Sequence, residues 1–147
     1  MVVVLDTGPL GLLTNPKRSE MNRACNHWLQ GVALAGTRII VPEIADYELR
    51  RELLRANKSN GLKRLDALIQ ALDYLPITTE AMRQAAGFWA QARQQGQPTA
   101  GDNTLDGDMI LAGQVATLRE NEIVIATTNV GHLSRFMAAE LWVDIRP

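Results

Sequence analysis

A chain of 147 residues with 46% hydrophobic and 21% charged residues has the size and composition of a single globular domain, here 1–147, and not of a disordered or fibrous protein. Its one cysteine, Cys25, excludes an intramolecular disulfide and a zinc ribbon, so the reducing cytoplasm is the expected location. The net charge of −1 gives no overall attraction for nucleic acid, so any such binding requires a local cluster of positive charge.

The N-terminal segment is apolar and β-branched over residues 2–5 and then acidic at Asp6. Such a run predicts a central strand that is buried on both faces, and Thr7-Gly8-Pro9 predicts a turn after it. Because the segment contains an acid and lacks a basic leader, we expect neither a signal peptide nor a membrane span. Asp6 is therefore expected at the carboxyl end of a buried strand.

Helices and strands are predicted to alternate along the rest of the chain. Periodic apolar residues predict helices that begin after Ser19, at Pro42 and at 78–80, with further helices at 59–72 and 104–120; the first should end near Gly36. Strands are predicted at 38–41, 75–77, 122–127 and 141–145, and a polar loop at 94–103. This order predicts an α/β fold with a mostly parallel central sheet flanked by helices on both sides. Ligands of such sheets usually bind at the carboxyl ends of the strands.

Three acids occupy positions from which they could converge. Asp6 ends the first strand, Glu48 lies among apolar neighbours on the helix after the second strand, and Asp108 lies near the start of the helix before the 122–127 strand. A single acid of this kind is usually a helix cap or a salt-bridge partner, whereas neighbouring carboxylates repel one another unless a cation lies between them. Oxygen ligands without paired His or Cys favour Mg²⁺ or Mn²⁺ over zinc. Such a site predicts phosphodiester hydrolysis.

Four segments of the chain carry a resemblance to a known family: MVVVLDTGPL, VPEIADYELRREL, LDGDMILAGQVA and IVIATTNVGHLSRF. They resemble the PIN-domain nucleases, especially toxins of the VapC type, in the order that the family requires. Asp6-Thr7 matches the acid that ends the first strand in the family, and Glu48-Leu49-Arg50 matches a helix that carries Glu before Leu-Arg. The segment 108–113 matches a helix that opens with an Asp-x-x-Ile-Ala-Ala-like motif. The segment 127–129 matches the final Thr-x-Asn of the family.

The resemblance implies a PIN-like domain that cuts RNA with Mg²⁺ or Mn²⁺ held by Asp6, Glu48 and Asp108. It also implies a homodimer and, in toxin members, inhibition by an antitoxin protein. Two threonines, Thr7 and Thr127, could orient a carboxylate or contact a phosphate. Asn129 could hold its loop through hydrogen bonds to the backbone, although all three residues also suit turns. The alternative function is a non-catalytic PIN-like domain that binds RNA or a protein partner.

The sequence departs from the family at the fourth acid, because His132 stands in the segment where many members have an Asp. A lone His in a turn is more often structural than catalytic. Asp106 is the first candidate for an additional metal ligand and Asp102 the second, although successive helical residues are about 100° apart, so Asp106 and Asp108 point to different faces. Glu43 and Asp46 are alternatives to Glu48, but an acid in the first turn of a helix, such as Glu43, is explained by the helix dipole.

One segment concentrates positive charge, with six basic residues against the single acid Glu52, a net charge of 6 − 1 = +5. The six are Arg50, Arg51, Arg55, Lys58, Lys63 and Arg64. We expect Arg50, Arg51 and Arg55 to guide RNA phosphates or to anchor an acidic inhibitor, unless the segment is only a solvated helix pair. Trp28 and Trp89 lie on amphipathic helix faces and are assigned to the core.

Overall fold

The computed structural model describes residues 1–95, 102–131 and 133–147, and its centre is a five-stranded sheet. The strand order is β3-β2-β1-β4-β5, and all four neighbouring pairs are parallel. This arrangement confirms the predicted mostly parallel α/β sheet. The strands are β1 (Val2–Leu5), β2 (Arg38–Pro42), β3 (Asp73–Leu75), β4 (Ile123–Thr127) and β5 (Ala139–Leu141).

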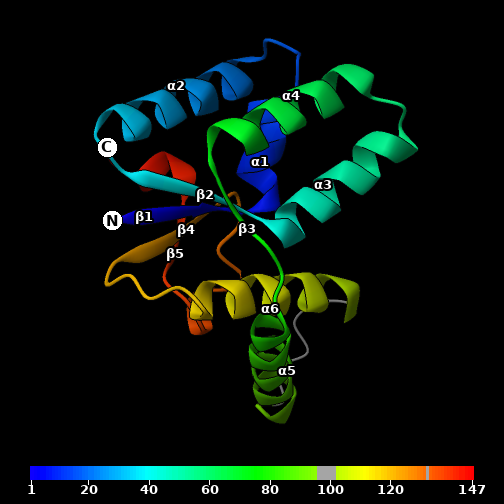
Figure 1. Cartoon of the computed structure of the whole chain (residues 1–147), viewed down its shortest axis with the longest axis vertical. Helices are drawn as coiled ribbons and strands as arrows, with labels where there is room; N and C mark the ends of the chain where they lie inside the picture. Colours follow the sequence, from blue (N-terminus) through cyan, green and yellow to red (C-terminus); the bar gives the residue numbers. More distant parts are fainter. Residues whose placement is uncertain (96–101, 132) are drawn as a thin grey trace.

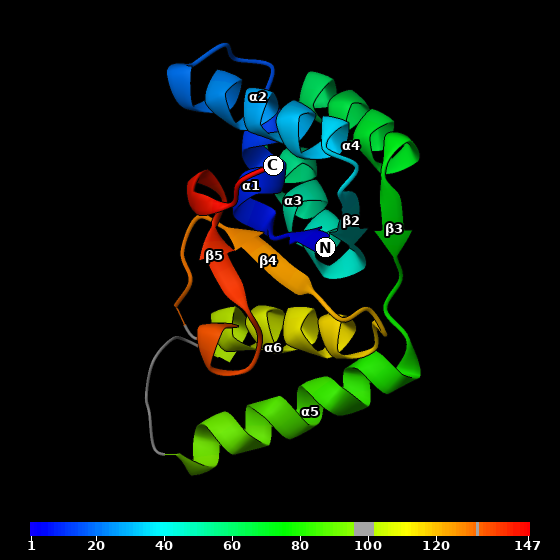
Figure 2. The same ribbon diagram turned by 90° about the vertical axis from the view of Figure 1, so that its left-hand side faces the viewer.

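Helices cover both faces of this sheet (Figure 1). Both views place the first four helices on one side and the last two on the other (Figure 2). The central strand β1 serves both layers, because Val3 and Leu5 pack into one apolar cluster while Val2 and Val4 pack into the other. The helices are α1 (Thr7–Thr14), α2 (Glu20–Leu34), α3 (Glu43–Arg55), α4 (Ser59–Ala71), α5 (Thr79–Gln94) and α6 (Asp102–Ala116).

The turn predicted at Thr7-Gly8-Pro9 is wrong, because α1 begins directly at Thr7. The side chain of Asp6 caps this helix by accepting a hydrogen bond from the Thr7 backbone N–H. Pro9 lies in the first turn, where backbone N–H groups have no partner within the helix, so its missing donor costs little there. Burial of Leu10 and Leu13 in the core then favours helix over turn.

The strand predicted at 141–145 is also wrong, because β5 ends at Leu141 and a short 3₁₀ helix (Trp142–Asp144) follows it. Trp142 and Ile145 are both buried, and their spacing of three residues suits a helical turn and not a strand. Trp142 packs on Trp28, with ring centroids 5.7 Å apart. The other core assignment, Trp89, is wrong, since 39% of this residue is exposed.

Several other boundaries differ from the prediction by a few residues. Strand β3 covers Asp73–Leu75 instead of 75–77, and α6 covers Asp102–Ala116 instead of 104–120. The predicted loop at 94–103 overlaps the ends of α5 and α6, and its positions 96–101 lie outside the described residues. Helix α2 ends where expected, because Gly36 has a φ of 84° that favours glycine. None of the described helices is long and apolar enough to cross a membrane.

A buried glutamine joins the two helices that carry candidate acids. Gln114 of α6 is fully buried; its Oε1 accepts a hydrogen bond from the Ile44 N–H at 3.2 Å, and its Nε2 donates one to the Leu75 carbonyl at 2.7 Å. The carboxylate of Glu43 adds a second connection, accepting a hydrogen bond from the Ile77 N–H at 2.7 Å. These bonds hold the start of α3 against α6 and the end of β3.

Candidate metal-binding acidic site

The carboxylate of Asp6 lies at the carboxyl edge of the sheet, where β1 passes into α1. Its Oδ1 accepts a hydrogen bond from the Thr7 N–H at 2.8 Å, and its Oδ2 accepts one from the Thr127 hydroxyl at 2.7 Å. Thr127 is the last residue of the neighbouring strand β4 and is almost fully buried. Burial raises the pKa of Asp6, although these two hydrogen bonds act in the opposite direction.

Glu48 approaches the same edge from α3. Its Oε1 accepts a hydrogen bond from the Thr7 hydroxyl at 2.8 Å, so Thr7 contacts Asp6 through its backbone and Glu48 through its side chain. The other oxygen, Oε2, lies against Gly107 of α6, where a Cβ atom would be only 2.5 Å away. Sequence reasoning missed Gly107, although a glycine inside a predicted helix is a signal of close packing.

Asp108 completes the group. Burial, followed by the negative charges of Asp6 and Glu48, raises the pKa of Asp108 from 3.8 to about 7. Asp108 makes no hydrogen bond or ion pair with the residues that the structure describes. The structure therefore brings together the three acids predicted from the sequence, and no described residue balances the negative charge of Asp108.

The donor chemistry of this group fits a hard divalent cation, because all the available ligands are carboxylate oxygens. The glycine at position 107 leaves the space that Glu48 Oε2 occupies. As placed, however, the described parts of the chain contain no set of three His, Cys, Asp or Glu side chains arranged to hold one ion. Binding of one cation by all three acids therefore requires at least one side chain to rotate.

The remaining candidate acids lie elsewhere or are bound elsewhere. Asp106 is exposed and lines a groove between α5 and α6 with Met82 and Trp89. It is not among the groups that raise the pKa of Asp108. The carboxylate of Glu43, one alternative to Glu48, already accepts the hydrogen bond from the Ile77 N–H described above. Both the side chain of Asp102 and residue His132 lie outside the described part of the structure.

Asn129 lies at the carboxyl edge just after β4 and organises the loop there. Its backbone N–H donates a hydrogen bond to the Thr127 hydroxyl oxygen at 3.1 Å, and its side-chain Oδ1 accepts one from the Gly131 N–H at 3.1 Å. The same threonine hydroxyl bonds Asp6. The Thr-x-Asn turn thus connects the loop to the acidic site through a single hydroxyl group.

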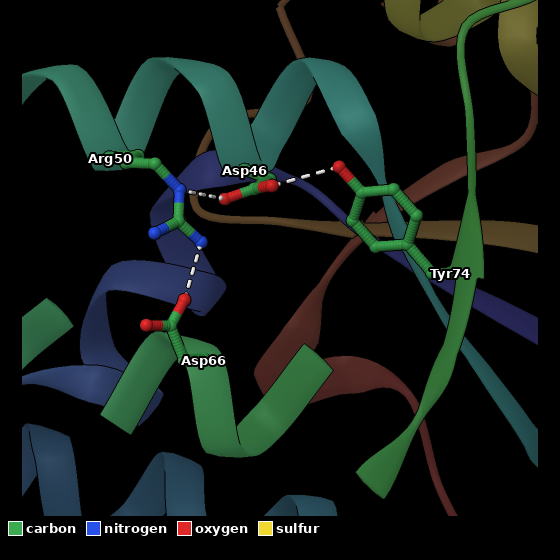
Figure 3. A network of polar contacts seen from close by, with 4 residues as sticks. All are labelled: Asp46, Arg50, Asp66 and Tyr74. Carbon is green, nitrogen blue, oxygen red and sulfur yellow. Dashed lines mark hydrogen bonds and ion pairs between the residues drawn. The ribbon is translucent and has the colours of Figure 1, made fainter. Parts of the chain in front are cut away.

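The arginines of α3 are largely engaged in contacts within the protein. Arg50 binds Asp46 at 3.0 Å and Asp66 at 2.7 Å, and Asp46 also accepts a hydrogen bond from the Tyr74 hydroxyl at 2.8 Å (Figure 3). Burial and the Asp46 carboxylate raise the pKa of Tyr74 above its ordinary value. This network joins α3 to α4 and β3, and it commits Asp46 and Arg50 to structural contacts.

The two other arginines predicted to contact RNA are exposed. Arg55 forms an ion pair with Glu52 at 2.8 Å, whereas the Arg51 guanidinium lies over the ring of Tyr47, 5.1 Å from its centroid. Both contacts lie within α3 and leave the side chains accessible to solvent. Because Arg50 and Arg55 form ion pairs within the protein, α3 offers less unpaired positive charge to a ligand than the sequence suggests.

A cavity of about 770 Å³ lies between α1, α3 and α4. It begins at Gly8 and Leu49, which follow Thr7 and Glu48 in the chain. Its lining also includes residues 15–17 of the α1–α2 connection, residues 57–58 of the α3–α4 connection and residues 59–61 in the first turn of α4. The lining of this hollow thus includes the chain neighbours of two site residues, Thr7 and Glu48, but none of the three acids.

Comparison with known proteins identifies the fold. No family model and no curated protein sequence matches this chain. Solved structures do match. One is VapBC2 from Rickettsia felis bound to a DNA fragment from their promoter, with a TM-score of 0.73, 17% identity and coverage of 97% of this chain and 99% of that chain. Another is FitAcB from Neisseria gonorrhoeae, with a TM-score of 0.69, 21% identity and coverage of 97% of this chain and 99% of that chain. DNA-bound VapBC from Salmonella typhimurium also matches, with a TM-score of 0.66, 22% identity and coverage of 97% of this chain and 98% of that chain. The chain therefore has the PIN-like fold of VapC-type toxins.

Proposed function

We propose that this protein is a Mg²⁺- or Mn²⁺-dependent endoribonuclease and the toxin component of a type II toxin–antitoxin system. The observation that carries the proposal is the convergence of Asp6, Glu48 and Asp108 at the carboxyl edge of a parallel sheet, where burial and then the charges of Asp6 and Glu48 raise the pKa of Asp108 to about 7. Carboxylates that repel one another in this way suit a site whose charge is balanced by a bound cation.

The three acids would hold the cation, which when bound polarises a phosphoryl oxygen and makes water a stronger nucleophile. Hydrolysis joins the water oxygen to phosphorus and breaks the bond to O3′, which receives a proton. The hydroxyls of Thr127 and Thr7 fix Asp6 and Glu48, respectively, so that both carboxylates remain oriented before the substrate arrives. Such preorganisation reduces the reorganisation that the reaction requires.

The partner proposal rests on the likeness to VapBC and FitAcB structures, which supports an antitoxin protein for this chain. A homodimer, as the resemblance to VapC-type toxins implies, is part of the same proposal. RNA as substrate rests on that resemblance together with the acidic site. The runner-up, a PIN-like domain that binds without cutting, is favoured by one observation: the described acids are not arranged to hold an ion without side-chain rotation.

The experiment is cleavage of a mixed pool of structured and single-stranded RNAs by purified protein with Mn²⁺, Mg²⁺ or a chelator. The proposal predicts cleavage only with metal, and its loss in Asp6→Asn, which keeps the side-chain volume but removes the charge. Asp144→Asn is the matched control, because Asp144 is exposed on the 3₁₀ helix after β5. A wild-type protein that is folded and binds RNA but cuts none of the pool would favour the non-catalytic alternative.

A further inference from the structure

A second cavity of about 430 Å³ lies beyond the far end of α1, between the α1–α2 connection, α2 and α4. Its lining carries four cationic side chains and one histidine, and no Asp or Glu from the described residues takes part in it. Apart from Pro16, every lining residue is polar. The cations are Lys17, Arg18, Arg23 and Arg64.

These four cations are available to a ligand. None of them forms an ion pair with a residue in the described part of the chain, in contrast to Arg50 and Arg55 on the neighbouring helix. The acid nearest to Arg64 in the sequence, Asp66, is already bound by Arg50. No ion pair among the described residues therefore balances the positive charge of the cavity, and an anionic ligand would balance it.

The backbone that presents Lys17 and Arg18 is held in place by asparagine side chains. Asn22 is buried, and its Nδ2 donates a hydrogen bond to the Lys17 carbonyl at 2.9 Å. The Lys17 N–H in turn donates to Asn15 Oδ1 at 3.0 Å. Because this connection is already ordered, a ligand would need to fix only the ends of the cationic side chains.

The cationic cavity adjoins the larger hollow between α1, α3 and α4. Asn15, Pro16 and Lys17 border both cavities, and the larger one ends at Gly8, next to Thr7. Helix α1 runs from the sheet, where Asp6 caps it, to the α1–α2 connection that lines the cationic cavity (Figure 1). Its eight residues span about 12 Å, which corresponds to roughly three or four nucleotides of a stacked strand.

We propose that the cavity formed by Lys17, Arg18, Arg23 and Arg64 binds backbone phosphates of the RNA strand, three or four nucleotides from the bond cut at the acids. This inference rests on the proposed function. Guanidinium, ammonium and side-chain amide groups are the donors that proteins use for phosphate oxygens. An acidic protein segment fits this cavity less well, because protein interfaces need apolar or aromatic anchors, and the leucines that could serve, Leu12, Leu49 and Leu53, line the neighbouring hollow while this lining offers only Pro16.

The test compares two double variants that remove the same charge. Arg18→Gln with Arg23→Gln removes two cations of the cavity, whereas Arg83→Gln with Arg119→Gln removes two exposed cations on the other side of the sheet. Binding of a labelled single-stranded RNA of about twelve nucleotides is measured by fluorescence anisotropy in chelator over a series of salt concentrations. The absence of metal keeps the RNA intact and separates binding from cleavage.

The proposal predicts an affinity loss of about tenfold or more near 0.1 M salt for the cavity variant, and a slope of log K against log salt that is shallower by about 1.4. The control variant should stay within about twofold of wild type. Equal losses in both variants, or an unchanged slope in the cavity variant, would overturn the proposal.

A cleavage measurement separates this inference from the proposed function. With metal, an RNA of about four nucleotides centred on the cut bond is too short to reach the cavity, so both double variants should cut it at the wild-type rate. A longer substrate should show a raised KM only in the cavity variant. If the wild type never cuts RNA but the cavity variant binds RNA more weakly than wild type, the nuclease proposal is refuted and the phosphate site stands. If the wild type cuts RNA and the cavity variant binds RNA as tightly as wild type, only the phosphate site is refuted.

Discussion

Gly107 lies so close to Glu48 that a Cβ atom at position 107 would be 2.5 Å from Glu48 Oε2. A glycine inside a helix costs about 1 kcal/mol relative to alanine. At this position the missing side chain leaves room for a carboxylate from another helix. Gly107 therefore lowers the stability of α6 but allows the Glu48 carboxylate to lie against this helix in the acidic site.

Gly107→Ala should consequently separate stability from metal binding. The better helix propensity opposes the strain of moving Glu48, so we expect the free energy of unfolding to change by less than about 1 kcal/mol. Displacement of Glu48 should weaken Mn²⁺ binding by about tenfold, measured by calorimetric titration. Gly87→Ala on α5 is the control, because its added Cβ would meet nothing within 4 Å. Equal Mn²⁺ affinity in Gly107→Ala and wild type would contradict this account of Glu48.

The raised pKa of Asp108 predicts a specific pH dependence of stability in metal-free protein. Between its ordinary value of 3.8 and about 7, the folded protein holds a proton that the unfolded chain has released. The free energy of unfolding should therefore fall as the pH rises through this window. Asp108→Asn should flatten that fall and be more stable than wild type at pH 8, by about 1 to 2 kcal/mol after allowance for solvent screening. Denaturant unfolding at several pH values measures this, and parallel curves for the two proteins would refute it.

Addition of metal should reverse the order of stability. Under the proposed function, the charged acids bind Mn²⁺ at pH 8 only in the folded state, so an ion concentration of about 100 times Kd should stabilise wild type by about 2.7 kcal/mol. Asp108→Asn should gain much less. Thermal unfolding with Mn²⁺ and then with excess chelator gives the comparison. An equal gain in both proteins would place the ion elsewhere.

Gln114 is predicted to hold the two acid-bearing helices in position. Gln114→Met keeps the length of the side chain but leaves the Ile44 N–H and the Leu75 carbonyl without a partner, so we expect a loss of about 2 to 4 kcal/mol. Gln70→Met on α4 makes the same change at an exposed position and should cost less than about 0.5 kcal/mol. Urea unfolding of both variants measures these losses. Similar losses of unfolding free energy in the two variants would contradict the role of Gln114 in holding the helices.

The fold and the convergence of the acids could be predicted because both follow from local patterns. A continuous apolar run such as 2–5 indicates a buried parallel strand, and the carboxyl ends of parallel strands meet at one edge. Asp6 and Glu48 were located by the elements that carry them. The prediction failed at Thr7-Gly8-Pro9, where turn-forming residues are overridden by the Asp6 cap and by burial of the following leucines.

Contacts between distant residues could not be predicted in the same way. Gln114 bonds groups 70 and 39 residues away, and Arg50 bonds Asp66 across two helices. No periodicity in the sequence encodes such pairs, because they depend on how the helices pack on the sheet. The six basic residues at 50–64 illustrate the consequence: in the fold Arg50 binds acids within the protein, while Arg64 lines a separate cavity.

The most direct test of the central claim is single-turnover cleavage of a labelled RNA in Mn²⁺ by wild type, Glu48→Gln and Asp108→Asn. The account predicts products with 5′-phosphate and 3′-hydroxyl ends from wild type, and a rate at least about 100-fold lower in each variant, as expected for the loss of a charged ligand to the metal. Cleavage at the wild-type rate by either variant, or cleavage that persists in chelator, would contradict the assignment of these acids to a metal-dependent nuclease site.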